Sequence, residues 1–421
     1  MKIMRQKKVF PALLMLLLAA SVLLPIVGAA ATTAESHQTT ECSPERDLTV
    51  SVHTASSIAS LKVNEIAGNI PDFADWRNGN VEFSTTYYNL EGIPAAYSFD
   101  VVVNGEYRGY ILVSATRNNY PILEFSKGFT PDKCSELMTH SSEIAGKFAE
   151  KRGLNTGDAE LLYLGATFYY AKFPLADSRG VKQDSVIIDL TAPSVVDEPS
   201  TRLPVTGDEF LQQQQEKQKE IGVLWEGLDD QMTSPDPTIS AESVTGTSGY
   251  INGVPTYLWQ VGCSPTASAM VLSYWDSHGY PNFPGEDPLI QELATAMGTT
   301  PEGSTWSWDI DDGIDDVCAN HGYSSMDSSD DAWMTFDEVK SEVDAQRPFV
   351  LSMWSGGTPI GGDEPYGDHS VACVGYHDYT EDWVSIHDTW DTQIHNVVYG
   401  DWLGAMATWV RPDLPLYCGG T

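Results

Sequence analysis

Alternating apolar and polar residues mark a group of strands between residues 96 and 190. The stretch "AYSFDVVVNGEYRGYILVSA" predicts two strands joined by Asn104 and Gly105, a dipeptide typical of a tight hairpin turn. Helical spacing before a glycine stop predicts a helix in "SSEIAGKFAEKRGL" (141–154). Further strands are predicted in "YPILEFSKG" (120–128), "AELLYLGATFYYAKFPLA" (159–176) and "DSVIIDLT" (184–191). We therefore predict a small α+β domain over residues 48–190.

This pattern stops after residue 190. Residues 191–249 are rich in proline, threonine and acidic residues, and their one helix-like segment is "EFLQQQQEKQKEIGVLWEGL" (209–228). We interpret 191–249 as a linker with a helix, open to proteases, and 250–421 as the second domain.

The N-terminus has the features of an export signal. Lysine and arginine residues precede a long apolar run that ends in the small residues Gly28 to Ala31. We predict a signal peptide over residues 1–31 and a flexible leader over 32–47. The Thr/Ser-rich stretch continues to about residue 60 without a clear period, so we expect it to be flexible as far as that residue. The expected location is secreted or cell-surface, and an uncleaved membrane anchor is the alternative.

The net charge of the chain limits which classes of binding partner are expected. The chain carries −36, and from Gly246 onward its basic residues are Lys340, Arg347 and Arg411. Such a surface repels nucleic acid and anionic lipid, so we expect no nucleic-acid partner and no stable membrane partner once the signal is cleaved.

An acid cluster, "WDIDDGIDDV" (308–317), raises the question of calcium. It lacks the ligand order and closing glutamate of an EF-hand. We interpret it as the acidic first turn of a helix that buries Ile310, Ile314 and Val317. No cofactor is expected, and calcium binding is left open.

Cys263 stands at the predicted start of a helix. Pro265 suits a first helical turn, and Ala267, Met270, Val271, Tyr274 and Trp275 recur at helical spacing behind it. Unsatisfied N–H groups and the helix dipole at such a position favour the thiolate, which is the nucleophilic form. The alternatives are a disulfide with one of the other cysteines (42, 134, 318, 373, 418) and an inert core cysteine.

A cysteine nucleophile needs a base, and His369 is the candidate. It opens the strand "SVACVGY", while Asp388 ends the next strand, "WVSIHDTW". A hairpin would bring the Asp388 carboxylate to the His369 imidazole. The alternatives are an exposed turn histidine and a surface acid, with Asp368 and Asp391 in reserve for the acid. The other candidate histidines, His278, His321 and His395, have turn-like contexts without a matching partner.

An oxyanion needs hydrogen-bond donors. The backbone N–H of Cys263 is one, and a side-chain amide just upstream would be the second. Gln260 is the nearest amide, and Asn252 is another.

The three motifs, in this order over about residues 250–410, resemble the papain-like superfamily of cysteine peptidases, and within it the bacteriocin-processing-peptidase-like family. The resemblance implies an α+β domain in which an N-terminal helix carrying the cysteine packs on an antiparallel sheet carrying the histidine and the acid. It implies Cys263 as nucleophile, His369 as base and then acid, and Asp388 as the orienting residue. The usual oxyanion glutamine lies six residues before the cysteine, where this chain has Tyr257. The N-terminal region resembles streptopain-type propeptides.

Together these observations predict an exported thiol peptidase made as a precursor, with peptide or protein substrates. Two other classes stay open: an amidase or acyl transferase of the transglutaminase type, and an inactive surface-binding protein. The N-terminal region could also be a noncatalytic binding domain, and the oligomeric state is undetermined.

Overall fold

The structure is a computed structural model that describes residues 48–196, 208–233, 246–354 and 368–412. From Leu48 onward these residues belong to one compact unit. The predicted signal peptide and leader lie outside the described residues. Among the helices that the structure describes, none is both long and apolar enough to cross a bilayer.

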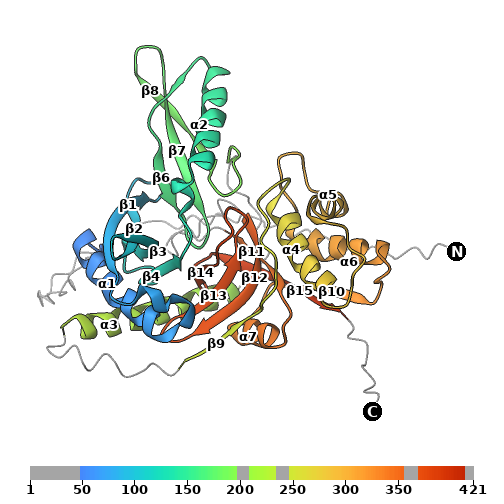
Figure 1. The fold of residues 1–421 in the computed structure, drawn as a ribbon. Coiled ribbons are helices and arrows are strands. Elements are labelled where there is room, and N and C mark those ends of the chain that lie inside the picture. The colour runs from blue at the N-terminus through green and yellow to red at the C-terminus, as the bar shows by residue number, and fades with distance from the viewer. Residues whose placement is uncertain (1–47, 197–207, 234–245, 355–367, 413–421) are drawn as a thin grey trace, which may run out of the picture. The chain divides into compact units, whose positions relative to one another are not determined.

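A mixed α+β architecture is built around one 15-stranded sheet (Figure 1). The helices are α1 (Val52–Asn69), α2 (Ser135–Glu150), α3 (Asp208–Thr233), α4 (Cys263–Ser277), α5 (Glu286–Ala296), α6 (Ile310–Asn320) and α7 (Phe336–Asp344). The strands are β1 (Asn80–Tyr88), β2 (Pro94–Val103), β3 (Glu106–Ser114), β4 (Ile122–Ser126), β5 (Asn155–Thr156), β6 (Glu160–Tyr163), β7 (Tyr169–Ala176), β8 (Lys182–Asp189), β9 (Thr247–Tyr250), β10 (Met326–Asp331), β11 (Phe349–Trp354), β12 (Asp368–Asp378), β13 (Asp382–His387), β14 (His395–Val398) and β15 (Gly404–Pro412).

The sheet crosses from the N-terminal region (residues 48–196) into the C-terminal region (246–412). Its order runs β10-β15-β11-β12-β13-β14-β4-β3-β2-β1-β6-β7-β5, with β8 on β7 and β9 on β12. The junction is the antiparallel pair β14–β4, in which His395 lies opposite Ser126 and Val397 opposite Glu124. The two regions therefore share main-chain hydrogen bonds as well as packed side chains.

Local sequence chemistry explains the elements of the N-terminal region. Asn104 and Gly105 both have positive φ angles, 54° and 79°, as the predicted hairpin turn between β2 and β3 requires. One expectation was wrong: residues 52–60 of the Thr/Ser-rich stretch belong to α1. Ser51 caps this helix by accepting a hydrogen bond from the Thr54 N–H (3.1 Å), and Ile58 is fully buried.

Helix α3 is anchored by side chains on one face. Ile221, Trp225 and Leu228 are buried in the core of the N-terminal region. The two terminal nitrogens of the Arg117 guanidinium, Nη1 and Nη2, each donate to a carboxylate oxygen of Asp229 at 2.8 Å. The predicted helix of the linker therefore packs firmly on the region that precedes it.

The C-terminal region packs α4 against β11 and β12 (Figure 1). Every residue from Ser264 to Leu272 is buried, so α4 is a core helix. The predicted acidic helix is confirmed as α6, in which Ile310, Ile314 and Val317 are fully buried. Full burial of one such side chain stabilises the fold by roughly 2 kcal/mol.

Candidate active site

Cys263 is the first residue of α4. Its thiol is free and half-buried, which argues against the disulfide and the inert core cysteine considered from the sequence. No side chain among the described residues caps this helix start, so its first N–H groups keep their hydrogen-bonding capacity. The Thr266 hydroxyl donates to the Gly262 carbonyl at 2.7 Å and closes the first turn.

Close packing around Gly262 holds the start of α4. A Cβ atom added there would lie 2.8 Å from the Gly303 carbonyl oxygen and 3.1 Å from a methyl group of Thr299. A glycine is therefore required directly before the cysteine, because backbone approaches it where a side chain would stand.

His369 lies on β12, facing α4. Its side chain is only 2% exposed and forms a hydrogen bond with the Cys263 side chain. A serine ladder beside it ties helix to strand: the Ser370 hydroxyl is 2.9 Å from the hydroxyls of both Ser264 on α4 and Ser352 on β11. The cysteine and the histidine are thus held together by two buried, cross-linked elements.

The charge state of His369 follows from opposing effects. Burial lowers the pKa of the imidazole, but the hydrogen bond and charge of Cys263 and the nearby Asp189 outweigh it and raise the pKa to about 9. Asp189 ends β8 in the N-terminal region. The protonated imidazole is therefore the favoured form at neutral pH.

Asp388 comes next to His369, but through a different atom than expected. The Nε2 atom of His369 lies 3.1 Å from the main-chain carbonyl oxygen of Asp388. The Asp388 carboxylate turns back instead: its Oδ1 accepts hydrogen bonds from the N–H groups of Trp390 (3.1 Å) and Asp391 (3.3 Å). The cause is a sharp turn after β13, in which Thr389 has φ +78°, a conformation that β-branched residues rarely adopt.

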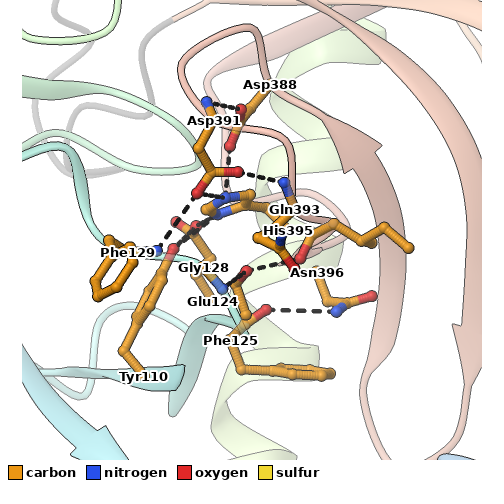
Figure 2. A network of polar contacts seen from close by, with 12 residues as sticks. Tyr110, Glu124, Phe125, Gly128, Phe129, Asp388, Asp391, Gln393, His395 and Asn396 are labelled. Carbon is orange, nitrogen blue, oxygen red and sulfur yellow. Dashed lines mark hydrogen bonds and ion pairs between the residues drawn. The ribbon is translucent and has the colours of Figure 1, made fainter. Parts of the chain in front are cut away.

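His395 was misjudged from the sequence. It is fully buried on β14, with Nε2 2.8 Å from Asp388 Oδ2 and 3.2 Å from Asp391 Oδ2. Its Nδ1 is 2.9 Å from Oε1 of Glu124 on β4 (Figure 2). Asp391 lies only four residues before His395, so the sequence could have suggested that contact. It could not have suggested the contact with Glu124, which lies 271 residues away along the chain.

Four other histidines that the structure describes do not contact the Cys263–His369 pair, although His387 directly precedes Asp388 and interacts electrostatically with His395. Burial lowers the pKa of His377 and of His387 to about 4, so both are neutral at pH 7. His321 pairs with Glu292 at 2.8 Å, and the His278 ring stacks on Tyr274. These contacts account for His321 and His278.

The predicted oxyanion side chain is committed elsewhere. The Gln260 amide donates to Asp287 (2.9 Å) and Glu286 (3.3 Å) in the first turn of α5. Tyr257, at the position where the resemblance implies a glutamine, donates its hydroxyl to Ser273 at 2.9 Å. Asn252 is exposed in a turn. The backbone N–H groups at the start of α4 are thus the donors that the described geometry offers.

Three side chains could in principle hold a cation. Ligand atoms of Asp388, Asp391 and His395 lie within 4.8 Å of one another. The neighbouring carboxylates raise the pKa of His395 well above its usual value despite its burial. The protonated ring then pairs with the carboxylates of Asp388 and Asp391.

One family model matches the part of the chain that carries the site. Residues 251–407 match the family model described as the Peptidase_C39 like family, and this range contains Cys263, His369 and Asp388. No curated protein matches the chain.

Two solved structures are similar at low identity. A protein described as a C39-like peptidase from Bacillus anthracis is 14% identical over 39% of this chain and 99% of its own, with a TM-score of 0.28. A fragment of prointerpain A from Prevotella intermedia is 12% identical over 78% of this chain and 98% of its own, with a TM-score of 0.36. Because both TM-scores are low, the assignment depends on the family match. Residues 251–407 are therefore similar to the Peptidase_C39 like family, and the match supports a cysteine peptidase domain in this part of the chain.

Proposed function

We propose that this protein is an exported cysteine peptidase, made as a precursor, that hydrolyses peptide bonds through Cys263, His369 and Asp388. The observation that carries the proposal is the hydrogen bond between the free Cys263 thiol and the buried His369 at the uncapped start of α4. This geometry pairs a nucleophile with its base, which is the requirement for covalent catalysis by a thiol.

The reaction follows from these groups. The Cys263 sulfur attacks the carbonyl carbon of the peptide bond, and its proton resides on His369. His369 then gives that proton to the leaving amine, which leaves an acyl-enzyme. Water, deprotonated by His369, attacks the thioester and releases the carboxylate product. The backbone N–H of Cys263 is available to stabilise the oxyanion at both stages.

The carbonyl of Asp388 sets the orientation of the base. A ring nitrogen near a carbonyl oxygen must carry a hydrogen, so His369 keeps its proton on Nε2. In the neutral ring Nδ1 is then the acceptor for the thiol proton. The role that the sequence suggested for Asp388 is retained, but it is exerted by the main chain.

Contacts between the N-terminal region and the peptidase region support the proposal that the protein is made as a precursor. Asp189 interacts electrostatically with His369. Partly buried apolar side chains of the N-terminal region pack against the core of the peptidase domain: Tyr88, Leu90, Ile187 and Val196. Export is proposed from the basic start and apolar run of the sequence.

The test uses the full chain, in wild-type form and as Cys263→Ala. Incubation with a peptide library, with and without a primary amine, separates hydrolysis from acyl transfer by the mass of the products. We expect carboxylate products in both cases, and amide products alone would contradict a peptidase. The N-terminus of the secreted protein is expected to differ between the two forms; an identical N-terminus in both would exclude self-processing.

Replacing Asp388 with asparagine tests the role of its carbonyl. The Asp388→Asn variant keeps the main-chain carbonyl and a side-chain oxygen for the turn, so kcat/KM is expected to fall only about tenfold, against about 10⁴-fold where a carboxylate orients the histidine directly. Asp388→Ala removes the side-chain anchor of the turn and is expected to cost roughly 100-fold. Steady-state kinetics on a peptide substrate measures both. A loss near 10⁴-fold in Asp388→Asn would assign the orienting role to the carboxylate.

A bell-shaped dependence of kcat/KM on pH is expected. Burial raises the pKa of Asp388 to about 6 although His395 opposes the shift, so the rate should rise through pH 6 as this carboxylate ionises. The raised pKa of His369 keeps its imidazolium as partner of the thiolate until the pH passes about 9, where the rate should fall. In Asp388→Asn the limb near pH 6 should disappear, because the amide does not ionise, whereas the limb near pH 9 should stay.

A further inference from the structure

His395 lies at the centre of a buried charged cluster beside the active site. Its ring is fully buried, and carboxylate oxygens of Glu124, Asp388 and Asp391 lie 2.9, 2.8 and 3.2 Å from its two nitrogens (Figure 2). The Tyr110 hydroxyl lies 2.9 Å from Nδ1 of His395, and burial raises the pKa of this tyrosine, so it stays neutral. His387 also interacts with His395, and its lowered pKa keeps it neutral. His395 is thus an imidazolium held from two sides.

Glu124 is fully engaged by this cluster. Besides His395, it accepts hydrogen bonds from the hydroxyl of Tyr169 (2.6 Å) and from that of Tyr110. Burying several charges requires such complete pairing, because desolvation opposes it. A buried ion pair is also weak evidence for stability, since apolar residues of similar volume often stabilise as well. The position of this cluster in the fold therefore says more about its role than its contribution to stability does.

A chain of contacts links His395 to His369, the proposed base, through Asp388. His395 holds one carboxylate oxygen of Asp388, and the turn N–H groups hold the other. The same aspartate presents its carbonyl to His369. The carbonyl of Thr389, next in the turn, accepts a hydrogen bond from the N–H of Trp259 at 2.7 Å, which ties the turn to the segment before Cys263. A shift of the Asp388 side chain would therefore move the carbonyl that orients His369.

The N-terminal region supplies Glu124, the carboxylate that contacts the Nδ1 side of the His395 ring. Glu124 belongs to β4, which pairs with β14, and opposite residues of this pair share a face of the sheet. His395 and Glu124 are diagonal neighbours on that face. Main-chain pairing therefore fixes the distance between the two side chains.

We propose that His395 is a positioning residue of the active site, and that Glu124 of the N-terminal region holds it against Asp388. This inference rests on the proposed function. It makes the N-terminal region a contributor to the active geometry as well as a restraint on the precursor, so separation of the two regions would leave His395 without one partner.

Kinetics of three variants of the full chain test this role. In His395→Gln we expect kcat to fall roughly tenfold with KM nearly unchanged, because misplacing an orienting group affects the reacting geometry more than binding. In Glu124→Gln we expect a smaller loss of the same kind. In both, the acid limb of the pH profile should move upward, since His395 lowers the pKa of Asp388.

Glu381→Gln is the matched control. Glu381 and Lys62 form another buried ion pair between the two regions, at 2.9 Å and 4% exposure, on the far end of the β12–β13 hairpin. Its loss should destabilise the fold without changing kcat or the acid limb. Equal kinetic effects in Glu381→Gln and Glu124→Gln, or none in His395→Gln, would overturn the proposal.

Two further measurements keep the test decisive. If Glu124→Gln fails to fold, Tyr169→Phe replaces it as the test, because it removes only one hydrogen bond to Glu124. This variant should shift kcat and the acid limb in the same direction as Glu124→Gln. An unchanged pH profile would count against the proposal.

The alkylation rate of Cys263 by iodoacetamide, measured against pH, needs no substrate. If the wild-type protein cleaves no peptide, the proposed function fails, while a shifted alkylation profile in His395→Gln still supports the positioning role.

Discussion

Replacing Cys263 with alanine is expected to lower kcat by about 10⁶-fold, the order of loss seen when the nucleophile of a hydrolase is removed. Without the sulfur no acyl-enzyme forms, and only the oxyanion donors and substrate binding remain to assist attack by water. The start of α4 should persist, because Gly262 and the serine ladder hold it independently of the thiol. Rates on a peptide substrate, with the folded state checked by thermal unfolding, measure the effect.

Cys134→Ala is the matched control for this change. Cys134 is also free and half-buried, but it precedes α2 in the N-terminal region. Burial raises the pKa of Cys318 and of Cys373 to about 12, so neither should react with a thiol reagent at neutral pH. Wild-type rates in Cys263→Ala, or a lost rate in Cys134→Ala, would refute the assignment of the nucleophile.

His369→Ala should lower kcat/KM by at least about 10⁴-fold, because the histidine serves as base, acid and counter-ion of the thiolate. Alkylation of Cys263 should slow at neutral pH and then rise with pH as a free thiol does, since the imidazolium partner is gone. Rates of alkylation from pH 5 to 10 would measure this directly.

His321→Gln is the control for the second change. His321 pairs with Glu292 near the surface, and its replacement should leave both hydrolysis and the alkylation profile unchanged. Retention of fast alkylation at neutral pH in His369→Ala would mean that another group activates the thiol.

The positions of the proposed catalytic residues could largely be predicted because their signals are local. The small residues, proline and helical spacing behind Cys263 specify a buried helix that starts at the cysteine. His369 and Asp388 stand on neighbouring arms of one hairpin, which alternation and a short polar turn are enough to predict. The acidic helix α6 was predicted for the same reason, since its apolar face recurs within a few residues.

Other features could not be read locally. In α1 serine and threonine residues interrupt the apolar spacing, and packing on β1 to β3 makes the helix. The Gln260 amide was predicted from proximity in sequence, yet two carboxylates on α5 take its hydrogen bonds. Distances along the chain do not reveal which of several acceptors a side chain will reach.

The sequence by itself determined that Cys263 begins a buried helix and that His369 and Asp388 stand on neighbouring arms of one hairpin, because each position is defined by a short local pattern. Only the tertiary structure decided which atom of Asp388 faces His369 and where its carboxylate goes. That choice depends on His395 and on Glu124, 271 residues away, which meet only because β4 of one region pairs with β14 of the other. Long-range strand pairing leaves no local signal, since its register is set when the two hydrophobic faces are buried together.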